Sequence, residues 1–295
     1  MTNSVQVEPE SDINSCVIAL HCSLSSGNQW ASLAEHLAGK HRFFAPDISG
    51  YGSNPGPFEL PSTLAEEAAL LVKALGDATG PIHLVGHSYG GAVAFKIATD
   101  SPLAGRIRSL TLIEPVLPTI LMENGADRRL YDHFVHVAHT VYEDLWNGLA
   151  WEAIEKFRAF WKGSAPSEEP SSKAIVRMVQ HADKLAFDFT SIIAERDVTA
   201  AAAAIRVPTL LLSGGLSPYL TQRVVWRLAS AIAGAETKHL PAAGHMLPIS
   251  HASAVNPLIA QHIARADELA GLSLALDGSA AEAAAPAKVV ALRTG

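Results

Sequence analysis

The chain has 295 residues, of which 48% are hydrophobic and 17% charged, and its formal net charge is −7 at pH 7. This composition suits one large globular domain with an insertion. The chain has only 22 lysines and arginines and no basic run, which argues against a nucleic-acid partner. No segment approaches the roughly 18 consecutive apolar residues of a membrane span, and the polar N-terminus lacks a signal-peptide pattern. We therefore expect a cytoplasmic protein, a monomer or homodimer, that acts on a small molecule without membrane contact.

The two cysteines indicate free thiols. Cys16 and Cys22 lie on one predicted strand. An extended strand holds residues at this spacing too far apart for a disulfide, which needs Cα atoms within about 7 Å. We expect neither a bound metal nor a cofactor.

Apolar strand-like runs alternate with helical segments along most of the chain, which predicts an α/β fold with a mostly parallel sheet flanked by helices. Strands are predicted at residues 16–22, 42–46, 82–85, 107–113, 207–213 and 236–240. Helices are predicted at residues 29–38, 63–78, from the turn after residue 85 to about 99, 221–233 and 254–270. Ser62 and Thr63 are the candidate N-caps of the second helix.

The alternation stops between residues 117 and 204, where aromatic-rich helical segments predict a cap inserted above the sheet. The core is then expected to comprise residues 16–116 and 205–270, with about six secure strands. Residues 1–15 are predicted to be disordered or to form one short strand. The low-complexity segment 271–295 is predicted to be disordered.

The most informative motif is Gly86-His87-Ser88-Tyr89-Gly90, which follows an apolar run and precedes a helix of small residues. Gly-x-Ser-x-Gly in this context is typical of a nucleophile elbow, a sharp turn that exposes a serine above a parallel sheet. The glycines leave room for the neighbouring strand and helix around a strained turn. The helix N-terminus places positive partial charge and free N–H groups beside the hydroxyl. We expect Ser88 to be a catalytic nucleophile.

Four motifs in chain order resemble those of the α/β-hydrolase superfamily: His21-Cys22-Ser23, Pro46-Asp47-Ile48-Ser49-Gly50-Tyr51-Gly52-Ser53, the elbow, and Ala243-Gly244-His245-Met246. The resemblance covers about residues 16–270. It implies an oxyanion turn in the first motif and the general base in the last, with the order nucleophile, acid, histidine. In the second motif, Asp47 is expected to fix its loop rather than to react.

His245 is the candidate general base, because a serine hydroxyl needs a neighbouring imidazole to accept its proton. Its loop follows the last predicted strand, at the carboxyl-end crevice where open α/β sheets bind ligands. His251, a few residues further on, is the competing candidate. His87 is expected to shape the elbow and border the substrate rather than to transfer protons.

The position of the predicted catalytic acid differs from the usual position that the resemblance implies. The family's usual acid position after the cap falls in the run Gly-Gly-Leu-Ser of residues 214–217, and Ser217 cannot carry the charge that stabilises an imidazolium. A second known position, at the end of the strand beside the nucleophile strand, holds Glu114. Neighbouring strands lie about 4.8 Å apart, so this carboxylate can reach a histidine above Ser88. We predict Glu114 as the acid, with Asp197 as the alternative.

The predicted oxyanion hole uses backbone N–H groups. One donor is Tyr89, directly after the nucleophile, and the other is Ser23 or, alternatively, Leu24. Cys22 stands where the family usually has glycine, and we interpret it as a small packed residue rather than a redox-sensitive thiol. The aromatic cap predicts an apolar, enclosed pocket for small or medium uncharged acyl substrates. The candidate substrate contacts are Leu24, His87, Trp146, Trp151, Trp161 and Met246.

Together these residues predict a serine hydrolase that cleaves a carboxylic ester through Ser88, His245 and Glu114. The resemblance also allows a carbon–carbon bond hydrolase, a perhydrolase, a lactonase or an acyltransferase. It disfavours haloalkane dehalogenation, because that branch of the family needs a carboxylate in place of Ser88. The alternative from a different class is a non-catalytic ligand-binding protein on the same scaffold.

Overall fold

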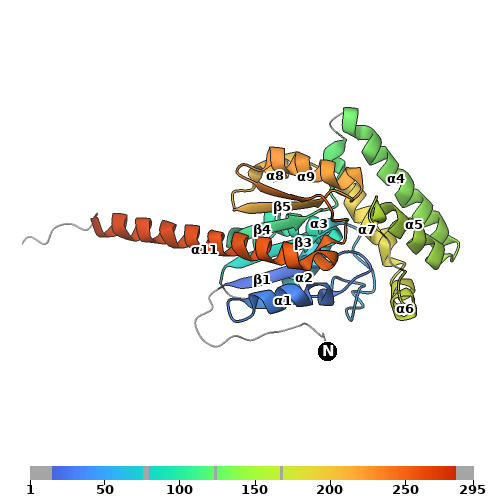
Figure 1. Ribbon diagram of the computed structural model, residues 1–295, viewed down its shortest axis with the longest axis horizontal. Coiled ribbons are helices and arrows are strands. Elements are labelled where there is room, and N and C mark those ends of the chain that lie inside the picture. Colours follow the sequence, from blue (N-terminus) through green and yellow to red (C-terminus); the bar gives the residue numbers. More distant parts are fainter. Residues whose placement is uncertain (1–14, 76–79, 123–124, 167–168, 284–295) are drawn as a thin grey trace, which may run out of the picture.

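The computed structural model describes residues 15–75, 80–122, 125–166 and 169–283. Within these residues, one six-stranded sheet has the order β2-β1-β3-β4-β5-β6, and all its neighbouring strands are parallel (Figure 1). The strands are β1 (Cys16–Leu20), β2 (Arg42–Phe44), β3 (Ile82–His87), β4 (Ile107–Ile113), β5 (Thr209–Gly214) and β6 (Glu236–Leu240). The predicted α/β class with six parallel strands is confirmed.

Helices cover both faces of the sheet. One face packs against α1 (Ala31–Leu37) and α11 (Ala252–Ala283), and the other against α2 (Leu64–Leu75), α3 (Tyr89–Thr99) and α9 (Tyr219–Ala231). The shorter helices are η1 (Gly27–Trp30), η2 (Ala104–Arg106), η3 (Pro118–Leu121) and α10 (Leu247–Ser250).

The side chains of β1 show how the sheet is buried between these layers. Val17 and Ala19 point into the hydrophobic cluster under α1 and α11, whereas Cys16, Ile18 and Leu20 point into the cluster under α2 and α3. All five side chains are buried. Because successive residues of a strand face opposite sides, a strand covered on both faces has a continuous apolar sequence.

The segment between β4 and β5 is helical in its described residues. Its helices are α4 (Gly125–Trp146), α5 (Ala150–Lys162), α6 (Ser172–Gln180), α7 (Lys184–Ala194) and α8 (Val198–Ala204). Figure 1 shows α4 to α7 gathered at one end of the sheet, while α8 lies beside α9. Helix α7 contacts α3, the helix that begins at the elbow, so this cap touches the core next to Ser88.

A capping box starts α2, the core helix that carries Glu67. Thr63 Oγ1 accepts a 3.1 Å hydrogen bond from the amide of Glu66, and the Glu66 carboxylate accepts one of 3.1 Å from the amide of Thr63. This reciprocal pair satisfies two amides that the helix itself leaves without acceptors. The structure thus confirms Thr63 as the N-cap.

The C-terminal helix is longer than the sequence predicts. Helix α11 continues to Ala283, whereas the prediction ends it at residue 270 and makes residue 271 the start of a disordered tail. Leucine and alanine are strong helix formers, and they are abundant in residues 271–283. The rest of that predicted tail, and residues 1–14, lie outside the described residues. Among the helices that are described, none combines the length and apolar composition needed to cross a membrane.

Candidate active site

Ser88 stands at the sharp turn between β3 and α3, with φ of 56° and ψ of −120°. Such a left-handed backbone conformation costs a non-glycine residue about 1–3 kcal/mol and is found mainly where function requires it. Close packing explains the flanking glycines. A Cβ on Gly86 would lie 2.4 Å from the carbonyl oxygen of Gly90, and a Cβ on Gly90 would lie 2.3 Å from that of His21. The elbow is therefore packed directly against the end of β1.

His245 brings its imidazole to the serine from the loop after β6. Its Nε2 atom lies 2.9 Å from Ser88 Oγ, and its Nδ1 atom lies 2.6 Å from Glu114 Oε2. Because an ionised carboxylate only accepts hydrogen bonds, Nδ1 carries the proton and Nε2 is free to accept one from the serine. The indole of Trp161, from cap helix α5, stacks on the imidazole with ring centroids 4.4 Å apart.

Glu114 directly follows β4 and is fully buried, with a φ of 44°. While its Oε2 atom faces His245, its Oε1 atom accepts a 2.7 Å hydrogen bond from the amide of Gly214, at the end of β5. This second donor fixes the orientation of the carboxylate. Ser217 is buried, and its hydroxyl has no hydrogen-bond partner among the described residues. The alternative acid, Asp197, precedes α8 and makes no hydrogen bond to His245 in the described part of the chain.

The two residues whose amides are the predicted oxyanion donors, Ser23 and Tyr89, line the cavity at Ser88. Tyr89 is the first residue of α3, so its N–H has no acceptor within the helix. Ser23 lies in the loop after β1 and precedes Leu24, whose φ is 58°. In the described residues, three of the four non-glycine residues with positive φ are Leu24, Ser88 and Glu114. Backbone strain is thus concentrated around the serine.

A chain of hydrogen bonds joins the loop after β1 to the loop of His245. The amide of Cys22 donates to Gln29 Oε1 at 3.2 Å, and Gln29 Nε2 donates to His87 Nδ1 at 3.1 Å. His87 Nε2 then donates to the carbonyl oxygen of His245 at 2.8 Å. Because one ring nitrogen of His87 accepts a hydrogen bond and the other donates one, the imidazole of His87 must be neutral. Burial, together with the nearby His245, lowers the pKa of His87 well below its usual value. His87 therefore supports the backbone of His245, and no part of it lines the cavity.

The thiol of Cys22 is buried beside this chain. Burial raises its pKa to about 12. Since the thiolate is the reactive form of cysteine, the thiol is unreactive at neutral pH. This agrees with the interpretation of Cys22 as a packed residue.

The cavity above Ser88 is small, and half of its lining residues are aromatic. Its apolar wall consists of Val116, Phe134, Phe157, Trp161, Phe189 and Ile192, and its polar part of Ser23, Ser88, Tyr89 and Asp188. The space open to the centre of a water molecule is about 10 Å³, which is room for about one water. A bound group must therefore be small, or cap side chains must move to admit it.

Several predicted substrate contacts lie elsewhere. Of the three tryptophans, only Trp161 lines the cavity; Trp146 is 91% exposed at the end of α4, and Trp151 packs half-buried against the hydrophobic core. Met246, which is 41% exposed, and Leu24 are also outside the lining. Phe157 and Trp161 both line the cavity because residues four apart share one face of a helix. The aromatic content of the cap, by contrast, does not indicate which helix face turns towards the cavity.

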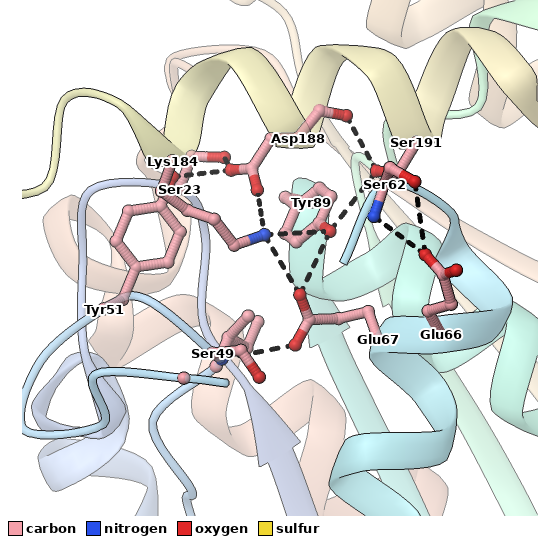
Figure 2. Close-up of polar contacts among 12 residues, drawn as sticks. Ser23, Ser49, Tyr51, Ser62, Glu66, Glu67, Tyr89, Lys184, Asp188 and Ser191 are labelled. Atoms are coloured by element: carbon pink, nitrogen blue, oxygen red, sulfur yellow. Dashed lines mark hydrogen bonds and ion pairs between the residues drawn. The ribbon is translucent and has the colours of Figure 1, made fainter. Parts of the chain in front are cut away.

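Figure 2 shows a buried polar network whose charged members belong to none of the four sequence motifs. Its charged members are Lys184 and Asp188 of α7 and Glu67 of α2, and none of them is more than 2% exposed. On α7 the two charged residues are four apart and share the buried face with Leu185 and Phe189. An oppositely charged pair on the apolar face of a helix is the pattern that could have revealed them.

Three potential metal ligands also gather at the other end of β3, far from Ser88. The ligand atoms of His41, His83 and Asp267 lie within 4.8 Å of one another. Asp267 Oδ1, however, accepts a 2.8 Å hydrogen bond from Arg108 and lies 3.2 Å from His83 Nε2. A guanidinium on this oxygen competes electrostatically with a metal cation. We interpret the cluster as an ion pair that holds α11 to the sheet.

The model of the alpha/beta hydrolase family matches residues 17–258, so the chain belongs to this family of hydrolases. It is 36% identical to Lipase LipV of Mycobacterium tuberculosis over 103 residues, which make up 34% of this chain and only 37% of the lipase. It is 25% identical over 255 residues to RutD of Klebsiella pneumoniae, named as a carbamate hydrolase, covering 84% of this chain and 91% of the relative. The solved structure of MenH from S. aureus has the same fold, with a TM-score of 0.76 and 18% identity, over 90% of this chain and 100% of that one.

Proposed function

We propose that the protein is a serine hydrolase that cleaves a carboxylic ester, or a related acyl bond, of a small apolar substrate. The observation that carries the proposal is the hydrogen-bonded line from Ser88 Oγ through His245 to Glu114, with distances of 2.9 and 2.6 Å. In such a line the imidazole can accept the serine proton, and the carboxylate stabilises the imidazolium that forms.

In the proposed reaction, Ser88 Oγ attacks the carbonyl carbon while His245 Nε2 takes its proton. The amides of Ser23 and Tyr89 donate to the oxyanion of the tetrahedral intermediate. His245 then gives the proton to the leaving alcohol, and an acyl-enzyme remains. A water molecule, deprotonated by the same imidazole, hydrolyses this ester and frees Ser88.

The small size and aromatic side chains of the cavity favour binding of short, uncharged acyl groups over long acyl chains. Two relatives are named as hydrolases, one a lipase and the other a carbamate hydrolase. The roles proposed for Ser88, His245 and Glu114 suit hydrolysis of an ester as well as of a carbamate. Because Ser88 lines this small cavity, we propose that the cavity holds the acyl group and selects it by size.

A fluorophosphonate probe and p-nitrophenyl esters test the proposal. Mass spectrometry should find the probe on Ser88, and the wild type should release p-nitrophenol faster from the acetate than from the decanoate. Ser88→Ala should lose the label and at least about 10⁴-fold in kcat, as expected for a nucleophile that acts with its base. A folded wild type that takes no label and cleaves no ester would favour ligand binding without catalysis.

A further inference from the structure

A buried ion network joins cap helix α7 to core helices α2 and α3 and to the loop after β1 (Figure 2). At its centre, Lys184 Nζ lies 2.7 Å from Asp188 Oδ1 and 3.0 Å from Glu67 Oε2. Burial alone would lower the pKa of Lys184, but the two carboxylates outweigh burial and raise it, so the ammonium is charged at neutral pH. A buried charge of this kind is stable only while its partners stay in place.

One arm of the network ends at Ser23, in the loop after β1. The Ser23 hydroxyl donates to Asp188 Oδ2 at 2.5 Å, and the Tyr51 hydroxyl donates to the same oxygen at 2.6 Å. Lys184 holds the other oxygen of Asp188, so the carboxylate is fixed at both ends. Hydrogen bonds to a charged acceptor are short and strong. The position of this loop therefore depends on a carboxylate from the cap.

The other arm ends at Tyr89, the first residue of α3. The Tyr89 hydroxyl donates to Glu67 Oε2 at 3.4 Å and accepts from Lys184 Nζ at 3.4 Å. These two hydrogen bonds are long, but the ammonium also lies 4.8 Å from the centre of the Tyr89 ring, a favourable cation–π distance. Lys184 thus holds the tyrosine by its ring as well as by its hydroxyl.

We infer that Lys184 and Asp188 are positioning residues that set the separation between the amides of Ser23 and Tyr89. Both of these residues offer an amide to the proposed oxyanion hole, and both send their side chains into the same network. Cap helix α7 would then help to assemble the oxyanion hole as well as cover the substrate. The inference rests on the proposed function, because the separation of the amides affects the rate only when an acyl carbonyl is attacked.

Ser23→Ala is the mildest test, because it removes one hydroxyl from a half-buried residue and keeps the amide. We expect kcat, and the rate constant for labelling of Ser88 by a fluorophosphonate, to fall by about 10- to 100-fold, since a misplacement of 1 Å can cost about 100-fold. KM should stay at the wild-type value. Asp188→Asn, which also alters the contacts of Asp188 with Tyr51 and Lys184, should lose at least as much as Ser23→Ala. The double variant should lose no more than Asp188→Asn alone, because both changes act on the hydrogen bond between Ser23 and Asp188.

Lys184 is tested by Lys184→Met combined with Glu67→Gln. The combination removes one positive and one negative charge together, which avoids leaving two buried carboxylates without their cation. It should lower kcat and the labelling rate, again without a change in KM. A wild-type kcat in this folded variant would overturn the role of Lys184.

A second ion pair between cap and core provides the matched control. Asp127 of α4 accepts hydrogen bonds from Arg223 and Arg227 of α9, at 2.9 and 2.8 Å. Asp127→Asn should lower Tm and leave kcat unchanged. The inference is wrong if Asp127→Asn lowers kcat as much as Ser23→Ala does, or if Ser23→Ala and Asp188→Asn keep the wild-type kcat. A wild type that neither takes the label nor cleaves an ester would overturn the proposed function, and the inference with it.

Discussion

Glu114 Oε2 lies 2.6 Å from His245 Nδ1, although 131 positions separate the two residues in the chain. The carboxylate comes from the end of β4, which lies between the nucleophile strand β3 and β5 in the sheet. The amide of Gly214 on β5 orients it from the other side. Three neighbouring strands thus hold the serine, the carboxylate and the amide that fixes the carboxylate.

Glu114→Gln should lower kcat by about 10⁴-fold, as the loss of the carboxylate does in serine proteases, because the neutral amide no longer selects the productive imidazole tautomer. The side chain keeps its size, so KM and Tm should change little. Turnover of p-nitrophenyl acetate measures the effect. The control is Asp197→Asn, which removes the alternative acid and should behave as wild type. Near-normal turnover in Glu114→Gln would show that this carboxylate is not the acid.

The three residues that meet at the site could be predicted because the constraints on them are local. The elbow needs glycine at positions 86 and 90 for steric reasons, and the strand–turn–helix pattern around Ser88 is visible in the sequence. Glu114 and His245 each follow an apolar or alternating strand at the carboxyl edge of the sheet. Their distances come from the structure, and their catalytic roles stay predictions.

The contacts that support the site could not be predicted, because they depend on how distant segments pack. Gln29 and His87 are 58 positions apart, and Ser23 and Asp188 are 165 apart. Ser23 and His87 each belong to a motif, but their partners Asp188 and Gln29 belong to none. The same reason explains the error at Trp146, since a helical segment rich in aromatic residues has an inner and an outer face that composition does not distinguish.

Gly90→Ala should disable the elbow. The added Cβ would lie 2.3 Å from the carbonyl oxygen of His21 and 2.5 Å from that of Leu20, and both contacts are with backbone atoms that cannot rotate away. Overpacking of this kind typically costs about 1–3 kcal/mol of stability, and the shift of β1 would displace the neighbouring amide of Ser23. We expect a lower Tm and at least about 100-fold slower fluorophosphonate labelling.

Gly105→Ala is the matched control for that experiment. A Cβ at Gly105 would meet nothing within 4 Å. This variant should keep the wild-type Tm and labelling rate. Equal behaviour of the two alanine variants would argue against a steric requirement at the elbow.

Phe157→Ala should shift the acyl-chain preference towards longer esters. Phe157 lines the small cavity and is only partly buried, so its removal enlarges the space without emptying the core. The ratio of kcat/KM for p-nitrophenyl octanoate to that for the acetate should rise, by about tenfold if one or two additional methylenes are buried at about 0.8 kcal/mol each. Phe160→Ala, on the same helix but outside the lining, should leave the ratio unchanged. An unchanged ratio in Phe157→Ala would mean that the acyl group binds elsewhere.

Asp267→Asn should weaken the fold in a pH-dependent way. Burial alone would raise the pKa of Asp267, but hydrogen bonds from His83 and Arg108 outweigh burial and lower it to about 2. Because the pKa in the unfolded chain is near its usual value of about 3.9, the carboxylate stabilises the fold above that pH, and the contribution is lost as the pH falls towards 2. Urea unfolding should show the variant less stable than the wild type at pH 6, with a difference that shrinks between pH 4 and pH 2. Asp132→Asn, at an exposed pair on α4, controls for the change in net charge. A difference as large at pH 3 as at pH 6 would rule out the ion pair as its cause.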